Sequence, residues 1–202
     1  LPGDLLMKMM GEFQLDYLDI LKRFLYCEFE EEMYPRLEQA GSVAEKKMPI
    51  ERVCVDINVT VRKKRKTVKF ARMVFALGNK ILGYRGMGGI DELNRNENFV
   101  LIGGPGKGKS TISQFIAQIY RAYYLQAMQY QSREMDKFIK EFEKGYGYRI
   151  DRVRIPFKVT LREYAAWINR KRSQENHSVI QYMGERTEKF EGSRLSVNIL
   201  RR

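Results

Sequence analysis

The chain has 202 residues, of which 44% are hydrophobic and 31% are charged, a composition that can bury a core and excludes an intrinsically disordered protein. Its formal net charge of +12 favours anionic partners such as a nucleotide, a nucleic acid or a membrane surface. Two cysteines exclude a disulfide framework and one histidine excludes a recognisable zinc pattern, so we expect a cytoplasmic protein. No apolar run approaches the roughly 18 residues that a membrane helix needs, which excludes a membrane partner of that kind.

The first part of the chain predicts a helical segment followed by a β-hairpin. Residues 12–40 place apolar side chains at helical spacing, and Gly41 ends the run. Residues 52–61 alternate and are rich in β-branched side chains, so they predict a strand. A basic turn at residues 62–66 separates this strand from a second apolar stretch, residues 68–77, which we expect to pair back onto it.

The second part of the chain predicts alternating strands and helices. Residues 98–102 form a short apolar strand, and residues 152–161 form another, which Pro156 places at an edge or makes irregular. Periodic apolar positions predict four helices, at residues 111–128, 131–144, 162–172 and 179–186. The strand–loop–helix–strand order from 98 to 161 is half of a βαβαβ unit, so the sequence predicts an α/β fold with a parallel sheet.

A glycine-rich loop joins the strand at 98–102 to the helix at 111–128. It reads G-x-x-x-x-G-K-S from Gly103 to Ser110, and a strand before the loop with a helix after it is the context in which this pattern binds phosphate. Glycines let the backbone point several N–H groups at one phosphate, and the helix N-terminus adds partial positive charge. The loop therefore predicts a P-loop that binds ATP or ADP with Mg²⁺.

The residues of the loop differ in what they contribute. Lys109 is placed to reach the β- and γ-phosphates, and the hydroxyl of Ser110 is placed to ligate Mg²⁺. Lys107 adds positive charge without a catalytic role. The predicted nucleotide-binding residues are Gly103, Gly104, Pro105, Gly106, Lys107, Gly108, Lys109, Ser110 and Thr111.

Three segments resemble the NACHT-type STAND NTPases, especially the large bacterial ones of anti-phage defence. Residues 98–114 resemble the P-loop of that family, and residues 155–163 (I-P-F-K-V-T-L-R-E) resemble its second core strand. Residues 53–57 (V-C-V-D-I) resemble the extended segment that lies near the base of the bound nucleotide in that family. The resemblance covers roughly residues 50–172, and the strand from 155 points to NACHT proteins rather than to any P-loop ATPase.

The resemblance implies a signalling switch in which ATP favours a homo-oligomeric active state and turnover is slow. It implies a trigger protein and an effector domain outside this chain, and adenine as the base. The expected fold is then an α/β P-loop NTPase with a parallel sheet and flanking helices, preceded by a helical segment and a β-hairpin. We expect the helical segment and linker in residues 1–48 and the N-terminal part of the NTPase domain in residues 49–202.

The carboxylate that would complete a magnesium site is not evident in the sequence. A Walker B strand, in which four apolar residues end in Asp, does not follow residue 161. The match at residues 53–56 lies before the P-loop, and the resemblance assigns Asp56 to the segment near the base. No catalytic residue is therefore assigned. We expect a piece that ends before Walker B, binds nucleotide and hydrolyses it poorly.

Two other functions stay open. A nucleic-acid-acting P-loop ATPase, a motor or loader, is favoured by the net charge and by the basic turn at 62–66, extended by Lys69 and Arg72, although a solvated turn explains these charges more simply. A small-molecule P-loop kinase lacks an acceptor-site signature. The tyrosines between 120 and 130 suit a base-stacking platform, but their helical spacing favours packing in the core.

Overall fold

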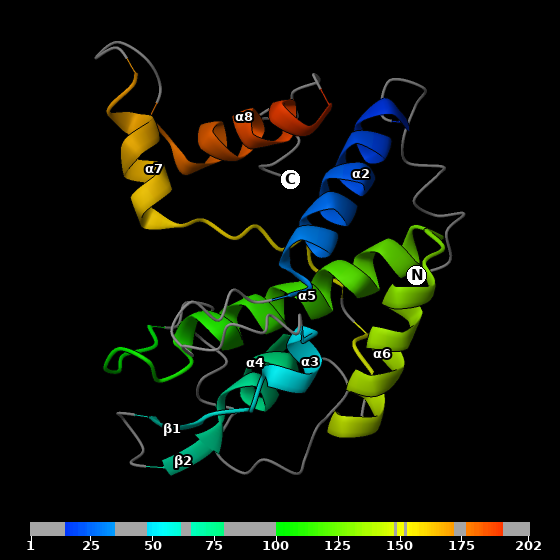
Figure 1. Cartoon of the computed structure of the whole chain (residues 1–202), viewed down its shortest axis with the longest axis vertical. Helices are drawn as coiled ribbons and strands as arrows, with labels where there is room; N and C mark the ends of the chain where they lie inside the picture. Colours follow the sequence, from blue (N-terminus) through cyan, green and yellow to red (C-terminus); the bar gives the residue numbers. More distant parts are fainter. Residues whose placement is uncertain are drawn as a thin grey trace.

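The computed structural model describes residues 15–34, 48–61, 66–78, 100–147, 149–151, 153–171 and 177–191. The elements in chain order are α2 (Leu15–Glu32), α3 (Ile50–Val53), β1 (Asn58–Val61), β2 (Lys66–Lys69), α4 (Phe70–Gly78), α5 (Lys109–Ala127), α6 (Arg133–Tyr146), α7 (Leu161–Ile168) and α8 (Val179–Glu191) (Figure 1). None of the helices in these ranges combines the length and the hydropathy needed to cross a bilayer.

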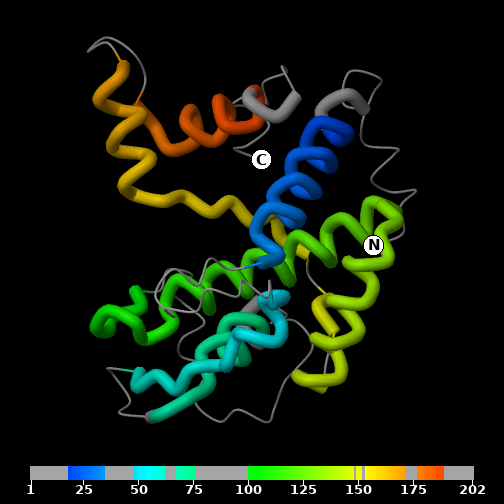
Figure 2. The backbone as a smooth tube through the Cα atoms, in the orientation of Figure 1, coloured from blue at the N-terminus to red at the C-terminus, as the bar shows by residue number. Residues whose placement is uncertain are grey.

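Helix α5 runs through the middle of the molecule. Figure 2 shows it between α2 on one side and α3 and α4 on the other, with α6 packed along its C-terminal half. The buried positions of α2 recur at helical spacing, at Leu21, Phe24, Leu25 and Phe29, and this stripe faces the core. Burial of such a stripe, rather than intrinsic propensity, is what holds a helix of this length in water.

An aromatic cluster joins α4, α5 and α6 into one core. Phe75 of α4 is fully buried, and its ring lies 6.4 Å from Phe115, 5.8 Å from Tyr120 and 5.1 Å from Phe142, measured between centroids. Most of these pairs are edge-on or tilted, which the ring quadrupole favours. The prediction that the tyrosines of α5 pack in the core is confirmed, since Tyr120 and Tyr123 are buried.

The two predicted helices that follow the glycine-rich loop are confirmed as α5 and α6, and local signals explain their ends. The Oγ atom of Ser132 accepts a hydrogen bond from the N–H of Met135 and so caps the start of α6. Gly147, with φ of +75°, lies in the left-handed region that commonly ends a helix. Helices α7 and α8 also form where helical spacing predicted them.

The hairpin is confirmed, but its boundaries were predicted wrongly. β1 and β2 pair antiparallel with Val59 opposite Val68, and the turn at residues 62–65 lies outside the described residues. Residues 52 and 53, assigned to the first strand, belong to α3, and residues 70–77, assigned to the second, form α4. A short apolar run fits a strand and a helix equally well, and tertiary burial decides between them.

The predicted strands at 98–102 and 152–161 do not pair in a sheet among the described residues. Residues 100–102 and 153–160 are extended chain, and the sheet in the described ranges is the two-stranded hairpin β1–β2. Val100 and Ile102 are 86% and 83% exposed. A strand needs neighbours that accept its backbone hydrogen bonds, and the described residues supply no paired strand here. The observed architecture is therefore mainly helical with a small sheet.

Candidate phosphate-binding site

The glycine-rich loop lies between the extended residues 100–102 and the first turn of α5. Gly106 and Gly108 have φ angles of +69° and +75°, which L-amino acids with a side chain rarely adopt. Gly108 is also the residue that precedes α5, and its carbonyl accepts a hydrogen bond from the N–H of Ile112 at 2.9 Å. The sequence thus has glycine where the backbone needs a left-handed conformation to enter the helix.

The side chain of Lys109 folds back from the helix over the start of the loop. Its Nζ atom donates hydrogen bonds to the carbonyl oxygens of Gly103, at 2.7 Å, and Gly104, at 2.6 Å. An ammonium group has three N–H donors. Two of them therefore tie the loop to the helix, and the third, together with the charge, stays available for an anion beside the loop.

Backbone donors of the loop add to this positive site. The N–H groups of Gly106, Lys107 and Gly108 donate no hydrogen bond to any described residue. The N–H groups of the first turn of α5 lack intrahelical partners because of helix geometry, and the helix dipole makes this end positive. The loop and helix start are largely exposed, so an anion can reach them.

The other predicted residues lie where the sequence placed them. Pro105 and Lys107 are exposed on the loop, Ser110 is exposed on the first turn of α5, and Thr111 is half-buried beside it. A Ser110 hydroxyl at this position fits a cation held mainly by phosphate oxygens and water, as Mg²⁺ prefers. Within the described ranges, no group of three or more His, Cys, Asp or Glu side chains could hold a metal ion.

Asp56 caps a helix. Its Oδ1 accepts a hydrogen bond from the N–H of Ala71 at 2.7 Å, and its Oδ2 accepts one from the N–H of Arg72 at 3.1 Å, both in the first turn of α4. The carboxylate that matched a Walker B aspartate therefore has a structural role.

Burial, with Asp56 nearby, raises the pKa of the Cys54 thiol to about 12, so this cysteine is not a reactive nucleophile at neutral pH.

The segment that contains Asp56 also supports the loop. The Cγ2 atom of Ile57 lies 3.8 Å from the position that a Cβ atom on Gly108 would take. The extended chain before β1 therefore lies against the point where the loop enters α5.

Two basic residues beyond the turn make contacts within the protein. The Nζ atom of Lys69 donates to the carbonyl of Asp56 at 3.0 Å. The guanidinium of Arg72 donates to the carbonyl of Gly145 at 3.3 Å and lies 5.3 Å from the centre of the Tyr146 ring. These contacts support the simpler interpretation of both charges, in which they do not follow a nucleic-acid backbone.

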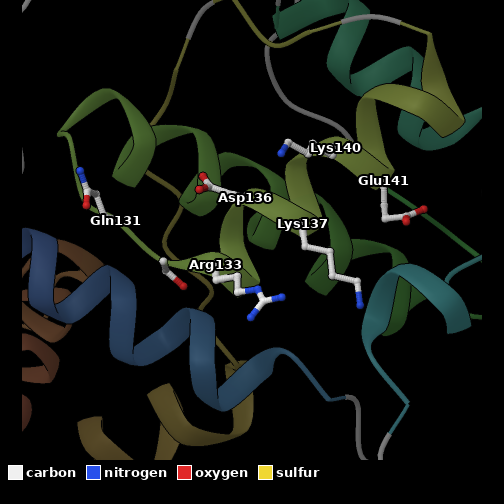
Figure 3. A pocket seen from close by; sticks show the side chains of 7 residues that line it. Gln131, Arg133, Asp136, Lys137, Lys140 and Glu141 are labelled. Carbon is white, nitrogen blue, oxygen red and sulfur yellow. The ribbon is translucent and has the colours of Figure 1, made fainter.

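An open pocket lies along α6, away from the glycine-rich loop. Its volume is about 700 Å³, and Figure 3 shows its lining side chains on the side of α6 that is near α2 and α3. The lining residues are Gln131, Ser132, Arg133, Asp136, Lys137, Lys140 and Glu141. Because charges of both signs line it, the pocket selects no particular ionic ligand, and none of the predicted site residues belongs to it.

A buried ion cluster was not predicted from the sequence. It joins α2, α5, α8 and the extended segment 153–160, and its members are Glu28, Glu32, Arg121, Lys158 and Arg186. One local signal was present: Glu28 interrupts the apolar stripe of α2, a position at which a carboxylate must have a partner if the stripe is buried.

No family model, curated protein or solved structure matches the chain.

Replacement of Asp56 by alanine removes the acceptor for two N–H groups of α4. Asp56→Ala should therefore lower the free energy of unfolding by about 1–2 kcal/mol, as loss of a helix cap does. The matched control is Asp19→Ala, because Asp19 is 62% exposed and its pairing with Lys22 at 3.4 Å is a surface contact. Urea unfolding of both variants checks this, and equal losses would contradict the capping role.

Two glycines of the loop provide a matched test of the observed backbone. Gly106→Ala should lower the free energy of unfolding by about 1–2 kcal/mol, because a Cβ atom disfavours a positive φ. Gly104 has no positive φ, and a Cβ added there meets no atom within 4 Å. Gly104→Ala should be neutral or slightly stabilising. If thermal unfolding shows that Gly104→Ala is more destabilising than Gly106→Ala, the loop has a different conformation.

Proposed function

We propose that the chain binds Mg²⁺–ATP, or ADP, through residues 103–111 and is the nucleotide-gated switch module of a NACHT-type STAND NTPase in anti-phage defence. The observation that carries the nucleotide assignment is the pair of hydrogen bonds by which the Lys109 ammonium holds the carbonyls of Gly103 and Gly104 at the positive end of α5. The Lys109 ammonium and the N–H groups of residues 106–108, which donate to no described residue, would together surround a phosphate group bound at the loop.

The chemistry of the loop supports a polyphosphate rather than a single small anion. Lys109 would reach the β- and γ-phosphates, and the N–H groups of residues 106–108 would donate to the phosphate oxygens between them. Ser110 would contribute its hydroxyl to Mg²⁺, and Thr111 would face the α-phosphate. Bound Mg²⁺ would neutralise phosphate charge, while the residues of this chain bind and orient the nucleotide.

The exposed apolar positions support a larger parallel sheet as part of this proposal. Leu101 packs against the core while Val100 and Ile102, on either side of it, are exposed. In the second segment, Val153 and Phe157 pack against the core while Ile155 between them is 42% exposed. This alternation is typical of strands. We therefore propose that both segments are strands of a P-loop NTPase sheet once neighbouring strands are present.

The resemblance at residues 155–163 supports the switch rather than another P-loop function. On that basis ATP favours a homo-oligomer, a trigger protein and an effector lie outside this chain, the base is adenine, and the protein acts in the cytoplasm. With no catalytic carboxylate assigned, we propose that the described chain binds nucleotide and turns it over slowly.

The net charge of +12 favours one alternative, a P-loop ATPase that acts on nucleic acid. The contacts of Lys69 and Arg72 weaken it, because these charges are already used within the protein.

Removal of the Lys109 ammonium tests the nucleotide site. Lys109→Ala should weaken Mg²⁺–ATP binding at least tenfold, or about 1.4 kcal/mol, because the variant loses the cation beside the phosphates. Lys107→Ala is the matched control, since it removes the same charge from an exposed position of the same loop and should have much less effect. Isothermal calorimetry that finds equal losses for the two variants would refute the assigned roles.

The basic turn separates the switch from the nucleic-acid motor. The variant replaces five residues with serine: Arg62, Lys63, Lys64, Arg65 and Lys66. If the protein is a switch, DNA and RNA bind more weakly than micromolar at physiological salt, and ATP affinity does not change in the variant. A motor would instead show tight binding that falls steeply with salt through counterion release and disappears in the variant. Filter binding at two salt concentrations distinguishes these outcomes.

A further inference from the structure

Helices α7 and α8 form a unit that is held together by its own contacts, and we call this unit the arm. The rings of Tyr164 and Trp167 on α7 lie 5.4 Å from that of Tyr182 on α8. The indole N–H of Trp167 donates to Glu185 at 2.7 Å, and Lys171 donates to the same carboxylate at 2.9 Å. Figure 1 shows the arm set apart from α3, α4, α5 and α6 and joined to them through the extended segment 153–160.

The arm contributes nothing to the apolar core of the body. No residue of α7 or α8 belongs to that core or to the apolar residues packed against it within the described ranges. Tyr182, which is the buried apolar residue of the arm, packs on the rings of α7 instead. The apolar core of the body therefore does not extend into the arm, and the arm meets the body where α8 packs along α2.

The ion cluster makes the connection. Arg186 of α8 pairs with Oε1 of Glu28 and donates from its Nη1 to the carbonyl of Lys158 at 2.7 Å. Lys158, at the root of the arm, pairs with Oε1 of Glu32 at 2.8 Å. The other oxygens of the two carboxylates bind Arg121 of α5, at 2.7 and 2.6 Å.

The two carboxylates therefore serve the body and the arm at once. Arg121 is fully buried, and its pairs are part of the packing of α2 on α5. Arg186 lies at the edge of the cluster, with 22% of its side chain exposed. Replacing the protein partners of Arg186 with water costs less free energy than replacing those of Arg121, because removing a partner from a fully buried charge is strongly destabilising.

We propose that the arm is a detachable unit and that Arg186 is its latch, which docks α7 and α8 on α2 through Glu28. When the Arg186–Glu28 bridge opens, the arm moves as one piece about the segment 153–160, while Arg121 keeps both carboxylates and the body stays folded. Because Glu28 and Glu32 are held by α5, the docked position of the arm depends on the position of that helix. This inference does not depend on which ligand the P-loop binds.

The single tryptophan of the chain, Trp167, is a reporter inside the arm. In Arg186→Gln, the fast component of its time-resolved fluorescence anisotropy should grow about twofold because the arm moves on the nanosecond scale. Its emission maximum should not shift, since Tyr164, Tyr182 and Glu185 still surround it. Amide exchange in α5 and α6 should stay at the level of the unchanged protein.

The matched control is Arg170→Gln, which removes the same charge from an exposed position of the arm and should change none of these signals. Arg186→Lys, which keeps a cation near Glu28, should restore most of the slow anisotropy. The proposal is overturned if Arg186→Gln leaves the anisotropy unchanged or if Arg170→Gln has an equal effect. A red shift of the emission, or faster exchange throughout α5, would also overturn it, because the arm would then not be a separable unit.

Discussion

The structure depends on the neutralisation of one buried charge. Arg121 lies in the middle of the molecule, on the helix that begins at the glycine-rich loop, and none of its side chain is exposed. An ion that is removed from water costs several kcal/mol unless partners compensate it. Glu28 and Glu32 supply that compensation from a single helix, one turn apart. The register of α2 against α5 is therefore determined by charge as well as by apolar packing.

The same face of α5 also completes the end of α2. The last carbonyls of a helix have no partner within it, and the side-chain amides of Gln118 and Gln114 donate to those of Phe29, at 2.7 Å, and Glu32, at 2.8 Å. With Arg121 these residues form a polar stripe at i, i+4 and i+7.

Burial raises the pKa of Glu28 above its usual value, although the guanidinium groups of Arg121 and Arg186 act to lower it. Burial also acts to raise the pKa of Glu32, but the cations of Arg121 and Lys158 outweigh that effect and leave this pKa below its usual value. The two carboxylates therefore differ in how firmly they hold their charge.

Local patterns predicted what is local in this fold. Helices α5 and α6 follow from apolar spacing and from caps that lie beside them in the sequence, and the loop conformation follows from glycines placed at positive φ. Helix α4 was missed because its cap, Asp56, is 15 residues from Ala71, beyond the reach of a local pattern. The ion cluster joins Glu28 to residues 93 and 158 positions away. The segments 100–102 and 153–160 have the alternation of strands, but pairing depends on neighbours that no local pattern specifies.

The glycine-rich loop and the ion cluster lie at two points along α5, and their separation limits how they can be coupled. From Lys109 to Arg121 the axis of α5 rises about 18 Å at 1.5 Å per residue. Exposed charges at that distance are largely screened, since the Debye length is about 8 Å at physiological salt. An anion bound at the loop would therefore have a weakened electrostatic effect on Glu28 and Glu32, which Arg121 already neutralises. Displacement of α5 is the remaining route, because a helix buried along this length moves as a rigid rod, and the carboxylates bound to Arg121 move with it.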